Sequence, residues 1–252
     1  MCEIGKGHTD STDILAASAV NAAGDLLYEE LTGPTDYPVP IGHHAELWLA
    51  SSFEPLVRRQ LLTLYHDRLG VDQTAPGAVN WLSETVWADP TTFYSIGQHL
   101  HPDSSIDALG IVRGAIGGNG ATLSRIAGTT GATRFAVVDG GNSVIWIDGS
   151  LSVNETGTGD GTQRVIATIP PGSNGRLLDI GCRSMVCVLL TSERASDDAS
   201  EWSLWRLELA TGQLQKVRSY SHSLRLAQVS PVSGAVVALE GPNLFLLDSV
   251  AP

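Results

Sequence analysis

Three side chains that could bind a metal lie close together in the stretch "HLHPD", at His99, His101 and Asp103. Histidines at positions i and i+2 of a strand share one face, and an aspartate can complete a metal site with them. His43 and His44 could supply further ligands. A metal-dependent hydrolase centred on this cluster is therefore the alternative function. The simpler interpretation is a pair of surface or capping histidines, because the stretch follows a helix-like pattern and lacks a further histidine.

Two other stretches contain the residue types of ligand-binding loops. The glycines of "GAIGGNGAT", at Gly117–Gly120, could cradle a phosphate, but no lysine follows and the next residues predict a strand, which favours a turn. The stretch "NETGTGDGT" has oxygen-bearing side chains at alternate positions from Asn154 to Asp160, as calcium loops do, yet it has few carboxylates and predicts a flexible loop. No Gly-x-Ser-x-Gly nucleophile elbow occurs. We therefore expect no cofactor.

Pairs of predicted strands recur along the second half of the chain. The stretches "FAVVDGGNSVIWIDG" from Phe135 and "GAVVALEGPNLFLLDS" from Gly234 share two valines, a glycine turn and an apolar strand that ends in aspartate. The stretch "LWRLELATGQLQKV", Leu204–Val217, predicts a hairpin around Gly212. Such units recur roughly every 40 to 50 residues, which is the length of one propeller blade.

The beginning of the chain resembles a WD40 repeat. Gly7-His8 precedes two predicted strands, Ile14–Val20 and Leu26–Leu31, and "LRLAQVSPVSGAVVAL" resembles the inner hairpin of such a blade. The closing Trp-Asp pair is absent, because Ile147 separates Trp146 from Asp148. The resemblance implies incomplete or irregular β-propeller-like blades. A helix over residues 12–31 is the competing interpretation, since this stretch is rich in alanine.

We expect a mainly β protein with a helical insertion. Residues 1–35 form a hairpin that belongs to the propeller-like part, and residues 106–252 form propeller-like β repeats. Residues 36–105 are predicted to be mainly helical, because apolar residues follow helical spacing and Glu54-Pro55 could begin a helix that runs to Arg68.

Charge and cysteine content exclude several classes of function. The net charge is −12 and the only lysines are Lys6 and Lys216, so nucleic acid and anionic membranes are not expected partners. No signal peptide or membrane-spanning stretch is seen, which predicts an intracellular protein, cytoplasmic or nuclear. Cys182 and Cys187 could bridge across a hairpin, but reduced buried thiols are the simpler expectation in such a compartment.

The predicted strands number about fourteen, or roughly three and a half four-stranded blades, which cannot close a ring. Exposed strand edges would then need a partner chain or the remainder of a larger chain, or the sheet is an irregular sandwich. We therefore expect a non-enzymatic scaffold or interaction subunit of a multiprotein complex that binds other proteins through blades and strand edges. The candidate partner-binding residues are Trp202, Trp205, Leu56, Leu61, Tyr65, Phe245 and Leu247.

Overall fold

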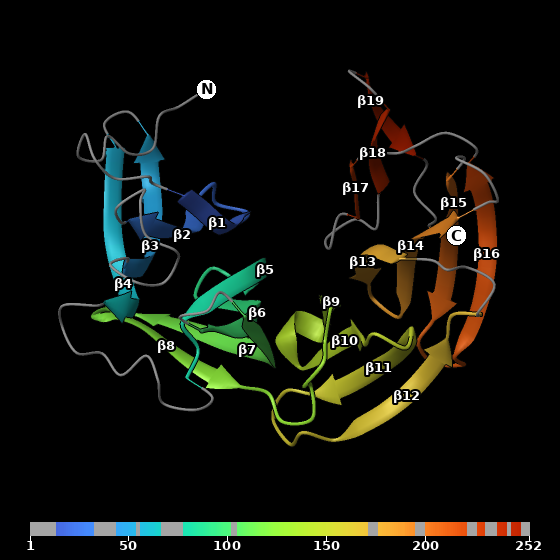
Figure 1. Ribbon diagram of the computed structural model, residues 1–252, viewed down its shortest axis with the longest axis horizontal. Helices are drawn as coiled ribbons and strands as arrows, with labels where there is room; N and C mark the ends of the chain where they lie inside the picture. Colours follow the sequence, from blue (N-terminus) through green and yellow to red (C-terminus); the bar gives the residue numbers. More distant parts are fainter. Residues whose placement is uncertain are drawn as a thin grey trace. The chain divides into compact units, whose positions relative to one another are not determined.

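The computed structural model shows a mainly β protein whose strands all pair antiparallel (Figure 1). No α-helix occurs in the residues that the structure describes, and the 3-10 turn η2 covers Asp139–Gly141. The described residues are 14–32, 44–53, 56–66, 78–101, 105–170, 176–194, 200–220, 226–229, 236–240 and 243–247.

The first of two compact units, Met1–Gly131, contains two four-stranded sheets. In both sheets the strands lie side by side in chain order. The first sheet consists of β1 (Ile14–Val20), β2 (Leu26–Thr32), β3 (His44–Phe53) and β4 (Leu56–His66). The second sheet consists of β5 (Trp81–Asp89), β6 (Thr92–Leu100), β7 (Ile106–Gly117) and β8 (Gly120–Arg125).

The second unit, Ala132–Pro252, contains three sheets in the same chain order. The first consists of β9 (Arg134–Val138), β10 (Ser143–Ile147), β11 (Ser152–Gly157) and β12 (Gln163–Thr168). The next consists of β13 (Arg176–Arg183), β14 (Val186–Arg194), β15 (Ser200–Glu208) and β16 (Gln213–Tyr220). The last consists of β17 (Leu226–Val229), β18 (Val236–Glu240) and β19 (Asn243–Leu247).

This arrangement confirms propeller-like blades. Each sheet is a meander of consecutive strands, and within each unit the first strands of successive sheets lie against each other: β1 against β5, β9 against β13, and β13 against β17. The hairpin predicted over Ile14–Leu31 is confirmed, with Ile14 opposite Leu31, and the competing helix is wrong. The structure has nineteen strands in its described residues, more than the fourteen expected.

The helical insertion predicted over residues 36–105 is wrong, because the described residues of that range form β3, β4, β5 and β6. The cause is a series of β-bulges. The β3–β4 register shifts between Leu47 and Trp48, so Leu61 is an extra residue on β4. Leu61 and Leu64 are consequently both buried although they are three residues apart. Bulges thus convert the alternation of a strand into spacing that resembles a helix.

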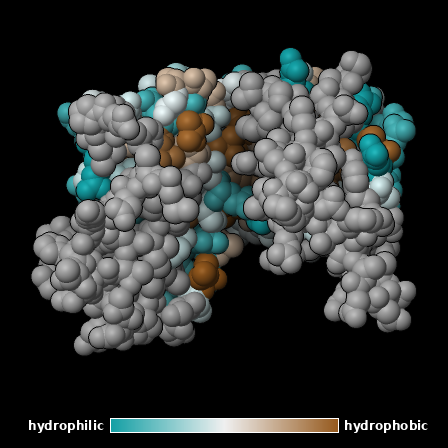
Figure 2. Space-filling model, turned by 90° about the horizontal axis from the view of Figure 1, so that it is seen from above, coloured by the Kyte–Doolittle hydropathy of each residue, from teal (hydrophilic) through white to brown (hydrophobic). Residues whose placement is uncertain are grey.

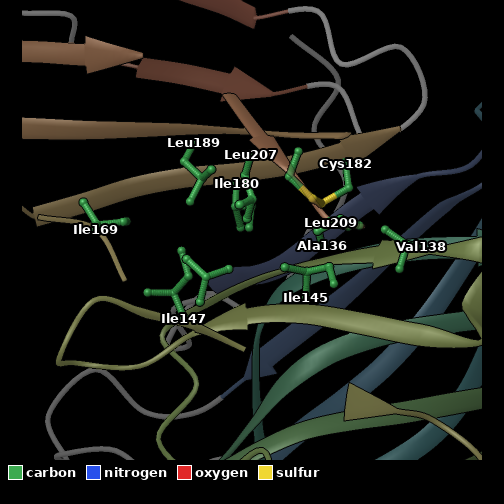
Figure 3. Close-up of a cluster of buried hydrophobic side chains, with 12 residues drawn as sticks. Ala136, Val138, Ile145, Ile147, Ile169, Ile180, Cys182, Leu189, Leu207 and Leu209 are labelled. Atoms are coloured by element: carbon green, nitrogen blue, oxygen red, sulfur yellow. A yellow bond between two sulfur atoms is a disulfide. The ribbon is translucent and has the colours of Figure 1, made fainter. Parts of the chain in front are cut away.

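Each unit has its own apolar core between sheets. In the first unit Leu27 and Leu47 pack with Leu82 and Phe93. In the second, Ile145 and Ile147 pack with residues of β13–β15 (Figure 3).

Cys182 and Cys187 belong to the core of the second unit and form a disulfide. They lie directly opposite each other on β13 and β14, with their Cα atoms 4.0 Å apart. The expectation of reduced thiols is therefore wrong, while the predicted hairpin at this site is confirmed. Disulfides persist chiefly in oxidising compartments, so this bond weighs against the expected reducing interior of the cell.

Glu29 is a buried carboxylate between the two sheets of the first unit. Its Oε2 atom accepts a hydrogen bond from the Leu82 backbone N–H at 3.0 Å, whereas Oε1 has no partner. The residue is fully buried, and this burial raises the pKa of Glu29 to about 8. Trp87 adds a second polar contact between the sheets, because its Nε1 donates to the Ala19 carbonyl at 3.1 Å.

Candidate functional site

The last sheet differs from the other four in the number of its strands. β19 pairs with β18 along one edge, from Glu240 opposite Asn243 to Val236 opposite Leu247, and no described strand pairs with its other edge. In the four complete sheets the corresponding edge of the third strand is covered by a fourth strand, β4, β8, β12 or β16. An edge of this kind presents backbone N–H and C=O groups to which another strand can pair.

In two complete sheets the fourth strand places a cation over an aromatic ring of the third strand. The Arg58 guanidinium on β4 lies 4.5 Å from the centre of the Trp48 ring on β3. The Lys216 ammonium on β16 lies 5.7 Å from the centre of the Trp205 ring on β15. Both separations fall within the range of cation–π attraction. These contacts therefore tie the outermost strand to its sheet by side chains as well as by the backbone.

The other two complete sheets also use a cation, but without an aromatic partner. Arg164 on β12 donates from Nε to Glu155 Oε2 on β11 at 2.6 Å. Arg125 on β8 donates from Nη2 to the Leu109 carbonyl on β7 at 2.7 Å. In every complete sheet, then, a cationic side chain of the fourth strand contacts the third.

Arg58 contacts two further side chains besides Trp48. Its Nη1 donates to Glu30 Oε2 at 2.8 Å and to the Tyr28 hydroxyl at 3.3 Å. Burial raises the pKa of Tyr28. The pKa of Arg58 is also raised, mainly by its hydrogen bond to Tyr28. The guanidinium therefore stays charged while it lies over the Trp48 ring.

Three of the fourth strands carry an exposed apolar residue. Val57 on β4, Val165 on β12 and Val217 on β16 are 51%, 64% and 46% exposed, and each lies next to an arginine or lysine. Charged neighbours at an edge strand oppose pairing between identical copies. The face shown in Figure 2 carries small hydrophobic patches separated by hydrophilic residues.

A short sequence signal accompanies the third-strand aromatics. Trp48 closes "ELW" on β3, Trp205 closes "SLW" on β15, and Phe245 closes "NLF" on β19. Each is paired with the second strand of its own sheet, opposite Tyr28, Leu189 and Ala238 respectively. Phe245 thus follows a leucine on the third strand of its sheet, as both tryptophans do.

The two predicted tryptophan anchors are partly buried in β15. Trp205 packs against the core of the second unit and donates from Nε1 to Thr191 Oγ1 at 2.9 Å. The Nε1 atom of Trp202 is buried and has no hydrogen-bond partner. The Trp205 side chain therefore stabilises its own sheet. A matching contact occurs in the preceding sheet, where Trp146 Nε1 donates to Thr156 Oγ1 at 3.0 Å.

The remaining partner-binding candidates divide between two strands. Leu61 on β4 is 5% exposed and packs in the core of the first unit. Leu56 and Tyr65 lie on the same strand, but their side chains are outside the described part. Phe245 and Leu247 lie on β19, whose second edge pairs with no described strand, and their side chains are outside the described part.

The two histidines of the predicted metal cluster each contact a different group. His99 Nδ1 contacts the Ala78 carbonyl at 2.8 Å and the residue is buried, whereas His101 Nε2 contacts Asp107 Oδ2 at 2.8 Å. The two rings lie edge to face with centres 4.6 Å apart. Asp103 lies outside the described residues, as do His43 and the side chain of His44.

Within the described part of the chain no three histidine, cysteine, aspartate or glutamate side chains are grouped as a metal site. The glycine stretch Gly117–Gly120 forms the predicted turn, between β7 and β8. The loop predicted around Asn154 is instead strand β11, in which Asn154 and Thr156 are buried. No helix in the described residues is long and apolar enough to cross a membrane.

Comparison with known proteins identifies no family. No protein-family model and no curated protein matches the chain. Similar solved structures include an oligogalacturonate lyase in complex with manganese, with TM-score 0.40 and 12% identity over 65% of this chain. Another is the Bacteroides ovatus xyloglucan PUL GH43B, with TM-score 0.48 and 13% identity over 90% of this chain. A third is the C-terminal WD40 domain of Sif2, with TM-score 0.47 and 10% identity over 94% of this chain. This chain covers 51%, 48% and 58% of those chains, about half their length.

Proposed function

We propose that this chain is a non-enzymatic interaction subunit of a multiprotein complex, and that β19 accepts a strand from a protein partner. The observation that carries the proposal is the second edge of β19, with which no described strand pairs, beside four sheets that each have a fourth strand in that place. Strand addition provides affinity through backbone hydrogen bonds, and it completes the last blade in the way that the chain completes its other blades.

The proposed partner is another polypeptide and not a second copy of this chain. The chain's own fourth strands carry cations next to their exposed valines, which opposes edge-to-edge pairing of identical strands. The net charge of −12 also makes two copies repel each other. No nucleic acid, membrane or cofactor is part of the proposal.

Site-specific photo-crosslinking in the cells that make the protein tests the proposal. A photoreactive amino acid in place of Phe245 on β19 should yield one discrete adduct with a second polypeptide. The same amino acid in place of Met185, which is 45% exposed in the turn between β13 and β14, is the matched control and should yield none. Adducts confined to the chain itself, or adducts equal at both positions, would contradict the proposed partner.

A further inference from the structure

We infer that His99 and His101 form a binding site for one divalent transition-metal ion of the zinc class. The ion is bound by Nε2 of His99 and Nδ1 of His101, and its remaining positions are open to water or to another ligand. This inference goes beyond the proposed function and does not depend on it, because its residues belong to the hairpin β6–β7 and the proposed strand acceptor is β19.

The hairpin β6–β7 brings the two histidine rings together. His99 on β6 is directly opposite Asp107 on β7, and His101 follows two positions later, so the two side chains share a face. The His101 backbone N–H donates to the Ser105 carbonyl at 2.9 Å, which holds His101 in the hairpin. The ring centres lie 4.6 Å apart. Two imidazoles on one zinc ion, each with a Zn–N distance of about 2.1 Å, have their centres roughly 5 Å apart.

The hydrogen bonds of the two rings determine which nitrogen atoms are left for a metal. His99 Nδ1 lies 2.8 Å from the Ala78 carbonyl, which can only accept, so in the neutral ring Nδ1 carries the proton and Nε2 keeps its lone pair. His101 Nε2 lies 2.8 Å from Asp107 Oδ2, a carboxylate that accepts, so Nδ1 keeps its lone pair. Neither of these two nitrogens has a hydrogen-bond partner among the described residues.

The same two hydrogen bonds are those that support histidine ligands in metal sites. A metal-binding histidine donates its other N–H to a backbone carbonyl or to a carboxylate, which fixes the ring and makes the free nitrogen more basic. This hairpin supplies one of each, the Ala78 carbonyl and Asp107. His99 is buried and thereby fixed, whereas the His101 side chain is 37% exposed and can turn toward an ion.

The ligand atoms decide the class of metal. Imidazole nitrogen suits Zn²⁺ and its neighbours among the transition metals, whereas Mg²⁺ and Ca²⁺ require oxygen ligands. No third histidine, cysteine, aspartate or glutamate in the described residues completes a metal-binding group with the two histidines. A tetrahedral ion on the two rings therefore keeps two positions for ligands from outside this site.

Titration of the full chain with ZnCl₂, followed by ¹⁵N NMR of the histidine rings, tests the inference. Without zinc we expect the proton on Nδ1 of His99 and on Nε2 of His101. One equivalent of zinc should shift the other nitrogen of each ring. His101→Ala should abolish this binding, and Asp107→Asn, which alters only the positioning residue, should weaken it about ten-fold. His222→Ala, a histidine elsewhere in the chain, is the control and should bind zinc as the wild type does.

The zinc-induced shifts and the variants each decide part of the inference. Shifts of both rings that disappear in His101→Ala support the site. Equal zinc affinity of the wild type and His101→Ala, or a shift of one ring alone, shows that zinc binds elsewhere or to a single histidine, and the inference is then wrong. An unchanged affinity in Asp107→Asn contradicts the positioning role of Asp107. Should His101→Ala not fold, His101→Gln takes its place, since the amide nitrogen has no lone pair for zinc.

Discussion

Glu29 couples the stability of the first unit to pH. Its carboxyl lies in an apolar core with one hydrogen bond, from the Leu82 N–H, and burial raises its pKa from 4.5 to about 8. Glu30 and Arg58 in the same sheet pair with each other. Because the folded pKa lies above the unfolded one, the protonated carboxyl is favoured by folding. This contribution is complete below pH 4.5 and is lost as the pH rises through about 8.

We predict that Glu29→Gln stabilises the protein at neutral pH. The amide keeps the shape of the protonated acid but cannot ionise, so the variant should gain up to about 3 kcal/mol in unfolding free energy at pH 7 and little at pH 4.5. Urea unfolding between pH 4.5 and 8.5 measures both values. Glu46→Gln on the neighbouring strand is the control and should follow the wild type. Parallel pH curves for Glu29→Gln and the wild type would show that the carboxyl is not held neutral.

At the scale of single elements, β7 depends on a glycine opposite an aromatic ring. Gly114 is paired with Phe93 on β6, and an added Cβ would overlap the Phe93 ring, which is fully buried. We predict that Gly114→Ala lowers the unfolding free energy by about 1–3 kcal/mol, since the ring has no room to move. Gly118→Ala, in the turn after the same strand, has nothing within 4 Å and should be nearly neutral in a thermal melt. Equal effects of the two substitutions would refute the steric argument.

The hairpin β13–β14 depends on the bond between Cys182 and Cys187. The two residues are separated by 5 positions, so the disulfide closes a short loop. We predict that replacing both with alanine, or reducing the wild type, costs about 2 kcal/mol of unfolding free energy. Urea unfolding with and without reductant measures the loss, and the double variant should be insensitive to reductant. Mass spectrometry that finds two free thiols in the unreduced protein would contradict the bond.

Hairpins were predictable because their signals are local. The turn at Gly212 and the pair Cys182–Cys187 place two strands within a few residues of each other, and the structure has them. β3 and β4 were not predictable from spacing, because their bulges bring Leu61 and Leu64 to one side. Periodicity assumes a regular element, and a bulged strand is not one.

The candidate site was partly visible in the sequence. Phe245 and Leu247 were expected to contact a partner, and the fold places them on β19, whose second edge pairs with no strand of the described residues. Cationic residues of the fourth strands can also be read in the sequence, in "LVRR", "QRV" and "QKVR". Their role was hidden because it depends on which strand lies beside them. Which strands lie next to each other depends on the tertiary fold and cannot be predicted from a single sequence.

For the whole molecule, the central claim is that the edge of β19 is open to a strand from another polypeptide. Amide hydrogen exchange tests it, measured on the chain alone and on the complex captured by crosslinking. In an edge strand the amides that point away from the sheet have no hydrogen-bond partner, so they exchange with solvent. We predict that alternate amides of Asn243–Leu247 exchange rapidly in the chain alone and become protected in the complex. If all of these amides are already protected in the chain alone, its own residues cover the edge and the account is wrong.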